Sequence, residues 1–183
     1  MFTATLYSAC AIAGIFSSIF LVVGSVFNNL IKTGSGGKFN FFAALFGLFA
    51  VLGIYLYQLE QAGIFGLIAF VLVFIGLVLI ASIDYNSIIL LPKFSIEELA
   101  KMTEGTGMMI LMISGVIFLL GEILFGISII LAGVFSTVAA VLWMIGYLPT
   151  PLGGAYPKIV LMGSILSAIG IIWWSLELWS FVN

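Results

Sequence analysis

Histidine and arginine are both missing from this 183-residue chain. Without histidine, the chain lacks the commonest axial ligand of haem, the commonest ligand of copper and catalytic zinc, and the commonest general base. Without arginine, it lacks the bidentate clamp that proteins use on phosphate and carboxylate groups. Cys10 is the single cysteine, so an intrachain disulfide is excluded. These absences predict no catalytic residues, no bound cofactor and no metal site, and a protein that is not an enzyme.

Charge is scarce as well. Charged residues make up 7% of the chain, against about a quarter in a soluble domain. The net charge of −2 leaves no basic field to attract nucleic acid. Hydrophobic residues make up 64% of the chain, and the mean hydropathy is +1.39. A surface this apolar cannot be solvated by water, so we predict an integral protein of the cell membrane with the lipid bilayer as its solvent.

Six apolar runs follow one another, separated by polar or turn-forming residues. They cover residues 6–27, 40–57, 64–83, 108–130, 135–147 and 157–179. Pro149 and Pro151 are expected to end the fifth run, and Pro157 suits the first turn of the sixth. The predicted fold is an all-α, multi-pass bundle of six transmembrane helices in a single domain, residues 1–183. Six crossings place both termini on the same side of the membrane.

Two of the connections between the apolar runs differ from the others. The boundary between the fourth and fifth runs carries no charged residue, and we place it at Ala132–Gly133, with a turn at Gly121–Glu122 as the alternative. The longest polar stretch, Asp84–Thr106, separates the third and fourth runs. Within it, Ser95 is followed by acidic residues, an arrangement typical of an N-cap with acids in the first helical turn. A short interfacial helix over Ile96–Thr103 is therefore predicted.

Small residues recur at four-residue spacing on three of the predicted helices. Such faces let helix backbones approach closely inside a membrane. The residues are Cys10, Gly14 and Ser18 in the first helix, Ala43 and Gly47 in the second, and Gly163, Ser164, Ser167 and Ala168 in the sixth. We interpret them as sites of packing within the chain, with self-association as the alternative.

Two segments carry a resemblance to other proteins. One runs from Gly53 to Phe70 and on to Ile75–Gly76, and the other runs from Phe118 through Gly126 to Val134. Both are similar to a group of uncharacterised prokaryotic membrane proteins of about this size. The resemblance extends over residues 40 to 180 and rests mostly on glycine and aliphatic positions. It implies six helices and a turn near Gly133, and it carries no activity.

The charges give conflicting indications of orientation. All five lysines, Lys32, Lys38, Lys93, Lys101 and Lys158, fall in the first, third and fifth connections. The positive-inside rule would make these connections cytoplasmic and place both termini outside, which is the orientation we favour. The resemblance implies the opposite, because members of that group carry basic residues in the two short links. Here those links, Gln58–Gly63 and Leu131–Thr137, contain none.

Glu122 is the acidic residue predicted to lie deepest in the membrane. It stands about ten residues before the end of the fourth run, roughly 15 Å from that exit at 1.5 Å per residue. An ionisable group in hydrocarbon costs at least about 2–3 kcal/mol, so it should face the bundle interior or a partner. Glu122 is therefore a candidate intramembrane proton or cation site. The alternatives are a neutral acid hydrogen-bonded to a serine, tyrosine or carbonyl of a neighbouring helix, and a residue in an interfacial turn.

Two classes of function remain. The first is a non-catalytic accessory or structural subunit that packs against other membrane subunits or another copy of itself. The two short links favour this class, because loops with almost no charge are better covered by a partner than by water. The second is a small transporter or channel with Glu122 as its coupling site. A transporter should show broken helices near the midplane and an inverted repeat, whereas this sequence shows only a weak parallel repeat.

Overall fold

The computed structural model describes residues 2–31, 35–89, 91–95, 97–98, 101, 104–150 and 156–182. Within these ranges the protein is all-α, as predicted. Its helices are α1 (Phe2–Val26), α2 (Gly36–Tyr57), α3 (Leu59–Ile89), α5 (Thr106–Ala132), α6 (Thr137–Tyr147) and α7 (Pro157–Val182). A π-helical turn, η1 (Phe27–Ile31), extends α1, and a 3-10 turn, η2 (Leu91–Lys93), follows α3. Five helices are long and apolar enough to cross a membrane, and α6 is a shorter apolar helix.

The end of α5 lies where the sequence predicted it. Ala132 is the last residue of the helix, and Gly133 adopts the left-handed conformation with φ of +67°. Its N–H donates to the carbonyl of Ile129 at 3.1 Å, the usual way in which a glycine ends a helix. The alternative turn at Gly121–Glu122 is wrong, because both residues lie inside α5. Pro157 begins α7, also as predicted.

The third span begins beyond a kink at Gly63, as predicted, but extends further than predicted at its other end. Residues 59–63 belong to α3 across a kink at Gly63, whose φ of +57° is accessible mainly to glycine. At the other end the helix continues past Ile83 to Ile89, so the expectation that Asp84 begins a loop is wrong. Ser87 Oγ donates to the Asp84 carbonyl at 2.7 Å.

The predicted interfacial helix falls largely outside the described residues. What is described is its beginning, a reciprocal capping arrangement between Ser95 and Glu98. The Ser95 N–H and hydroxyl both donate to Glu98 Oε2 at 2.8 Å, and the Glu98 N–H donates back to Ser95 Oγ at 3.3 Å. These bonds stabilise the ionised carboxylate, with the backbone N–H contributing most, and they lower the pKa of Glu98 below its ordinary value.

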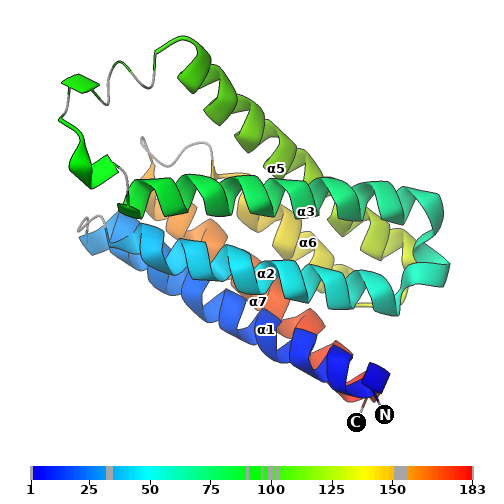
Figure 1. The fold of residues 1–183 in the computed structure, drawn as a ribbon. Coiled ribbons are helices and arrows are strands. Elements are labelled where there is room, and N and C mark those ends of the chain that lie inside the picture. The colour runs from blue at the N-terminus through cyan, green and yellow to red at the C-terminus, as the bar shows by residue number, and fades with distance from the viewer. Residues whose placement is uncertain are drawn as a thin grey trace.

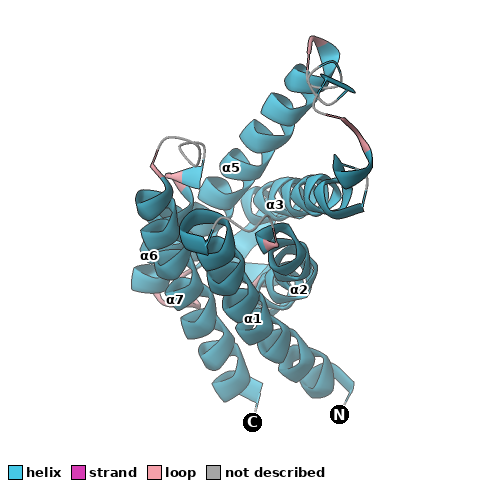
Figure 2. Ribbon diagram, turned by 90° about the vertical axis from the view of Figure 1, so that its left-hand side faces the viewer, coloured by secondary structure: helices cyan, strands magenta, loops and turns pink. Residues whose placement is uncertain are grey.

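The six helices form a closed ring. Each packs against the next in chain order, and α7 packs against α1 to complete the circle. The two chain termini lie together at one end of the bundle (Figure 1), in agreement with an even number of crossings. We call this the terminal end, and the opposite end, which carries η1 and η2, the loop end. Figure 2 views the ring from the loop end and shows α5 leaning away from the other helices.

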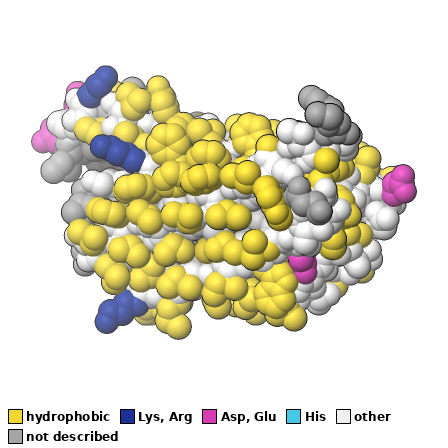
Figure 3. All heavy atoms as spheres, turned by 90° about the horizontal axis from the view of Figure 1, so that it is seen from below, with side chains coloured by type: hydrophobic (Ala, Val, Ile, Leu, Met, Phe, Trp, Pro, Cys, Tyr) yellow, Lys and Arg dark blue, Asp and Glu magenta, His cyan; other side chains and the backbone are white. Residues whose placement is uncertain are grey.

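The outer surface is suited to lipid. Hydrophobic side chains cover the middle of the face shown in Figure 3, and charged side chains lie toward its two ends. Among the exposed residues, Ile64, Leu131 and Met112 are 79%, 71% and 65% accessible. In water this surface would be strongly unfavourable, whereas in a bilayer it requires no cover. By helix length and hydropathy, the protein is a multi-pass membrane protein.

Candidate functional site: a central cavity

A cavity of about 480 Å³ occupies the centre of the ring. All six helices contribute to its wall, so it is a property of the closed ring rather than of one helix pair. The walls near α2 consist of small residues that leave room along the axis: Ala43, Ala44, Gly47 and Ala50. This volume lies in the range of cavities that hold small organic ligands.

The cavity is polar toward the loop end and apolar deeper in the bundle. The polar residues stand near the helix ends that face away from the termini: Ser25, Asn28, Asn29, Asn40, Asp84, Thr150 and Ser164. Asn28 and Thr150 are exposed, so the cavity reaches the surface there. Val51, Ile54 and Ile171 line the deeper part. A ligand entering from the loop end would therefore meet hydrogen-bonding groups first and hydrocarbon afterwards.

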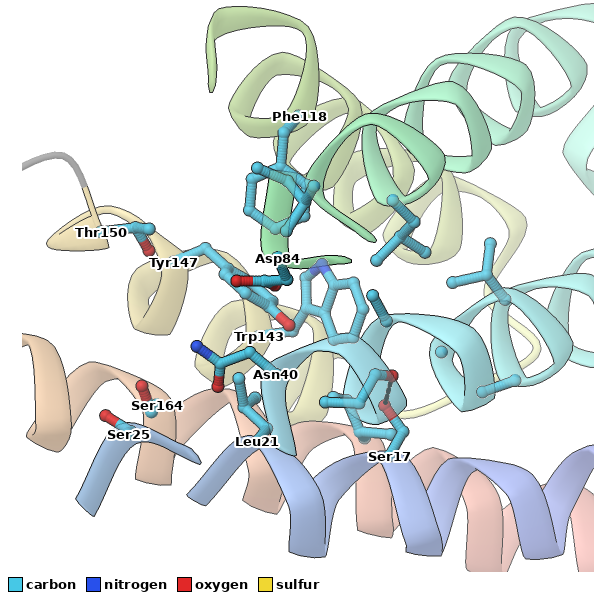
Figure 4. Close-up of a pocket in the computed structure, with 18 of the residues that line it drawn as sticks. Ser17, Leu21, Ser25, Asn40, Asp84, Phe118, Trp143, Tyr147, Thr150 and Ser164 are labelled. Atoms are coloured by element: carbon cyan, nitrogen blue, oxygen red, sulfur yellow. Dashed lines mark hydrogen bonds between the residues drawn. The ribbon is translucent and has the colours of Figure 1, made fainter. Parts of the chain in front are cut away.

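Asp84 and Asn40 are the two cavity residues with unpartnered buried oxygens. Asp84 Oδ2 and Asn40 Oδ1 are both buried and have no hydrogen bond to any residue that the structure describes. Figure 4 shows the two side chains in the cavity, close to Tyr147. Gly24 makes room for Asn40, because a Cβ atom at that position would overlap the amide oxygen. An acidic side chain and an amide side chain therefore line the loop end of the cavity.

One side of the cavity is aromatic. Phe118 and Tyr147 meet edge to face with ring centroids 5.2 Å apart, and Trp143 meets Tyr147 at the same separation. Trp143 also packs at 5.2 Å against Trp174, which is fully buried. We call Phe118, Trp143 and Tyr147 the aromatic wall. Its rings hold one another in place, so the wall is a firm surface on one flank of the cavity.

Glu122 lies behind the aromatic wall, not in the cavity lining. Its side chain is fully buried, so it faces the bundle interior rather than lipid. The Trp143 indole N–H donates to its backbone carbonyl at 3.3 Å, and Tyr147 is near enough to interact with it electrostatically. The predicted side-chain hydrogen bond to a neighbouring helix is not formed, since both carboxyl oxygens lack a partner among the described residues.

Gln58 is a further buried polar residue, at the terminal end. It follows α2, where its N–H donates to Ile54 at 3.3 Å and its carbonyl accepts from Ala62 at 2.8 Å. The side chain is fully buried, and both of its amide atoms lack hydrogen bonds among the described residues. The backbone of Gln58 is therefore satisfied, whereas its side chain is not.

These unpartnered groups lie at three depths in the bundle. Asp84 and Asn40 are at the loop end. Glu122 is beside Gly121, which packs against the backbone of Val73, eleven residues before Asp84 in α3. That interval corresponds to roughly 16 Å along a helix. Gln58 lies beyond it, at the terminal end of α2. We call these four residues, which lie at successive depths of the bundle, the polar axis; Asp84 and Asn40 line the cavity, whereas Glu122 and Gln58 do not.

The small residues that the sequence marked lie at helix contacts within the chain. Cys10, Ser18, Ala43, Ser167 and Ala168 are at most 6% exposed. The three marked glycines, Gly14, Gly47 and Gly163, are buried as well, and Ser164 is half-buried beside the cavity.

Some of these contacts are very close. A Cβ atom at Gly14 would overlap Ser175 of α7, and one at Gly163 would overlap the Gly146 carbonyl of α6. Two serines add hydrogen bonds between helices. Ser17 Oγ donates to the Ala43 carbonyl at 2.8 Å, and Ser167 Oγ donates to the Trp143 carbonyl at 3.2 Å.

The sequence interpretation missed Asp84 and Asn40 as cavity residues. A signal for Asp84 was present, because Val73, Leu77, Ile80 and Asp84 follow one another at the four- and three-residue intervals of one helix face. Nothing comparable marked Asn40, which stands at the predicted start of a span, where a polar residue is unremarkable.

No family model matches the chain, and no curated protein or solved structure matches it either. The fold and the surface therefore define its class, a helical multi-pass membrane protein.

Proposed function

We propose that this protein is a small, non-catalytic transporter that moves a polar solute or cation along the centre of its helix ring. In this proposal Glu122 is the intramembrane proton or cation site. The observation that carries the proposal is the polar axis, in which side chains without partners occur at three depths between the loop end and the terminal end.

Energetics favour a functional reason for these groups. A buried polar group without a hydrogen bond costs about 1–3 kcal/mol relative to a satisfied one, and more when it is charged. A bundle that served only as a scaffold would be more stable with apolar residues at these positions. The serines between helices show that this chain does pair its polar groups elsewhere, as Ser17 and Ser167 do. Unpartnered groups along one axis are therefore suited to exchange partners with a moving solute or proton.

The cavity adds a one-sided opening. It reaches the surface at the loop end, where Asn28 and Thr150 are exposed. At the terminal end, Tyr57 packs between Phe135 and Phe181, with ring centroids 5.8 and 5.1 Å away. In alternating access, the cavity of a transporter opens to one side of the membrane at a time. A cavity that is open at the loop end and closed at the terminal end matches one of these two states.

Transport is tested with purified protein in liposomes that contain a pH-sensitive dye. A panel of amines, amino acids, sugars and inorganic cations is added outside, and internal pH and membrane potential are recorded. We expect at least one solute to drive a proton or charge flux. Glu122→Gln preserves the hydrogen-bonding capacity of the residue but removes its proton chemistry, and it should reduce this flux about tenfold or more.

Glu60→Gln is the matched control, because it makes the same chemical change at an exposed acid near the start of α3. It should leave the flux unchanged. If no solute produces a flux above that of empty liposomes, or if Glu122→Gln and Glu60→Gln behave alike, the transporter proposal is wrong.

A second candidate, an accessory subunit, is supported by the first half of α5. The side chains from Met108 to Ile113 are all exposed, with Met109 and Met112 at 59% and 65%. This half of the helix leans away from the rest of the bundle (Figures 1 and 2). Apolar side chains exposed around a helix can pack against a partner subunit or a second copy as well as against lipid. Native purification from the source membrane would reveal such a subunit as a stoichiometric companion.

A further inference from the structure

The cavity combines one carboxylate with an aromatic wall. We propose that it binds an organic ammonium ion, with the charged nitrogen between Asp84, Asn40 and the aromatic wall and the hydrocarbon part in the deeper cavity. This inference rests on the proposed function in that it uses the same cavity and names the class of solute. Binding at equilibrium, however, requires no transport.

The charge of the cavity lining favours a cationic ligand. The carboxylate of Asp84 forms no ion pair among the described residues, and the chain contains no arginine that could supply one. The lysines of the described part, Lys38, Lys93, Lys101 and Lys158, are all exposed. A partly buried carboxylate that has no cation beside it among the described residues is stabilised when a ligand brings the positive charge.

The aromatic part of the cavity lining also favours a cation. Tyr147, Trp143 and Phe118 line the same cavity as Asp84, and Figure 4 shows these side chains around it. The face of an aromatic ring attracts a cation, and sites for quaternary ammonium groups are commonly built from several such rings. Asn40 also lines the cavity, with its amide oxygen packed against Gly24 of α1.

The lining of the cavity fits a bare metal ion less well than an organic cation. Calcium takes six to eight oxygen ligands, and magnesium needs a near-octahedral set. Asp84 is the single carboxylate in the cavity lining, and no group of three potential metal ligands occurs among the described residues. The deeper wall of Val51, Ile54 and Ile171 offers hydrocarbon contact that an inorganic ion cannot use. An amphiphilic cation uses both parts of the cavity.

The experiment measures binding of radiolabelled benzyltrimethylammonium to the purified full chain in a neutral detergent. Neopentylbenzene, its uncharged carbon isostere, serves as competitor, and calcium chloride is the inorganic arm. We expect the radiolabelled ammonium ion to bind saturably. Unlabelled benzyltrimethylammonium should compete for the site at least about tenfold more effectively than neopentylbenzene does. Asp84→Asn should weaken binding about tenfold or more, because it removes the charge and retains the shape. Glu60→Gln should leave the affinity unchanged.

The binding measurements test the ammonium site whether or not the protein transports a solute. Equal competition by the isostere, unchanged affinity in Asp84→Asn, or calcium binding in place of ammonium binding would overturn it. If Asp84→Asn does not fold, Val51→Phe fills the deeper cavity instead, and retained affinity in that variant would also overturn it. Ammonium binding without any solute-driven flux would support this inference and refute the transporter proposal. Flux of a neutral solute without ammonium binding would do the reverse.

Discussion

The helix contacts and the polar axis treat polar atoms in opposite ways. At the contacts, small residues bring backbones together, and serine hydroxyls donate to carbonyls of the same or a neighbouring helix, as in Ser18 to Gly14 at 2.9 Å and Ser17 to Ala43 at 2.8 Å. Along the axis, Asp84, Asn40, Glu122 and Gln58 keep buried atoms without partners. The contacts therefore hold the fold together, and the axis is left free for another task. Substitutions in the two regions should have opposite effects on stability.

The largest effect is expected at a helix contact. Gly121→Leu would place a Cβ atom 2.6 Å from the backbone Cα and N atoms of Val73, and backbone cannot move aside as a side chain can. We expect the free energy of unfolding to fall by about 3 kcal/mol, because overpacking would separate α3 from α5. Thermal unfolding in detergent measures this.

Gly115→Leu is the control on the same helix, since a Cβ atom there meets nothing within 4 Å. It should change stability by less than about 1 kcal/mol. Equal destabilisation by the two substitutions would show that close approach at Gly121 does not determine the packing of α5 on α3.

A smaller effect of the opposite sign is expected on the axis. Glu122→Met keeps a similar volume and removes two buried oxygens without partners. We expect the protein to become more stable by about 1 kcal/mol, because no group is left unsatisfied by the change. The same unfolding assay measures it. A clear loss of stability would mean that the carboxyl group holds the bundle together, and the contrast between the two regions would fail.

The smallest effect is local and outside the membrane-spanning segments. Ser95 donates two hydrogen bonds to Glu98, and these lower the pKa of that carboxyl. A lowered folded-state pKa means that the capping interaction contributes stability above the unfolded pKa and loses it as the pH falls through the folded pKa. Ser95→Ala removes the hydroxyl and should shift the pKa of Glu98 upward, toward its ordinary value. Carboxyl chemical shifts in an NMR titration would show this, and an unchanged pKa would contradict the capping geometry.

The parts of the fold that depend on local chemistry were predictable from sequence. Gly133 and Pro157 mark helix boundaries because of their backbone preferences, and the structure places α5 and α7 accordingly. The burial of Glu122 followed from the cost of an ionisable group in hydrocarbon. The capping of Glu98 by Ser95 followed from the spacing of the two residues.

The cavity could not be predicted in the same way. It exists because small residues of α2 leave space when six helices close into a ring, and the closure of the ring is a property of tertiary packing. Asp84 was assigned to a loop because an acidic residue near the end of an apolar run suits either a loop or the last turns of a helix. Only the continuation of α3 to Ile89 distinguishes the two.

The short length of α6 has an electrical consequence. Its 11 residues rise roughly 16 Å, about half of the roughly 30 Å hydrocarbon thickness of a bilayer. The helix begins at the terminal end and stops at Tyr147, where polar residues connect the cavity with the surface. Water in that cavity would carry the potential of the adjoining solution inward, so most of the transmembrane voltage would fall across the half of the bundle between Tyr147 and Gln58. A unit charge that moves through this half would gain or lose close to the full 2.3 kcal/mol per 100 mV, and membrane potential would act directly on its passage.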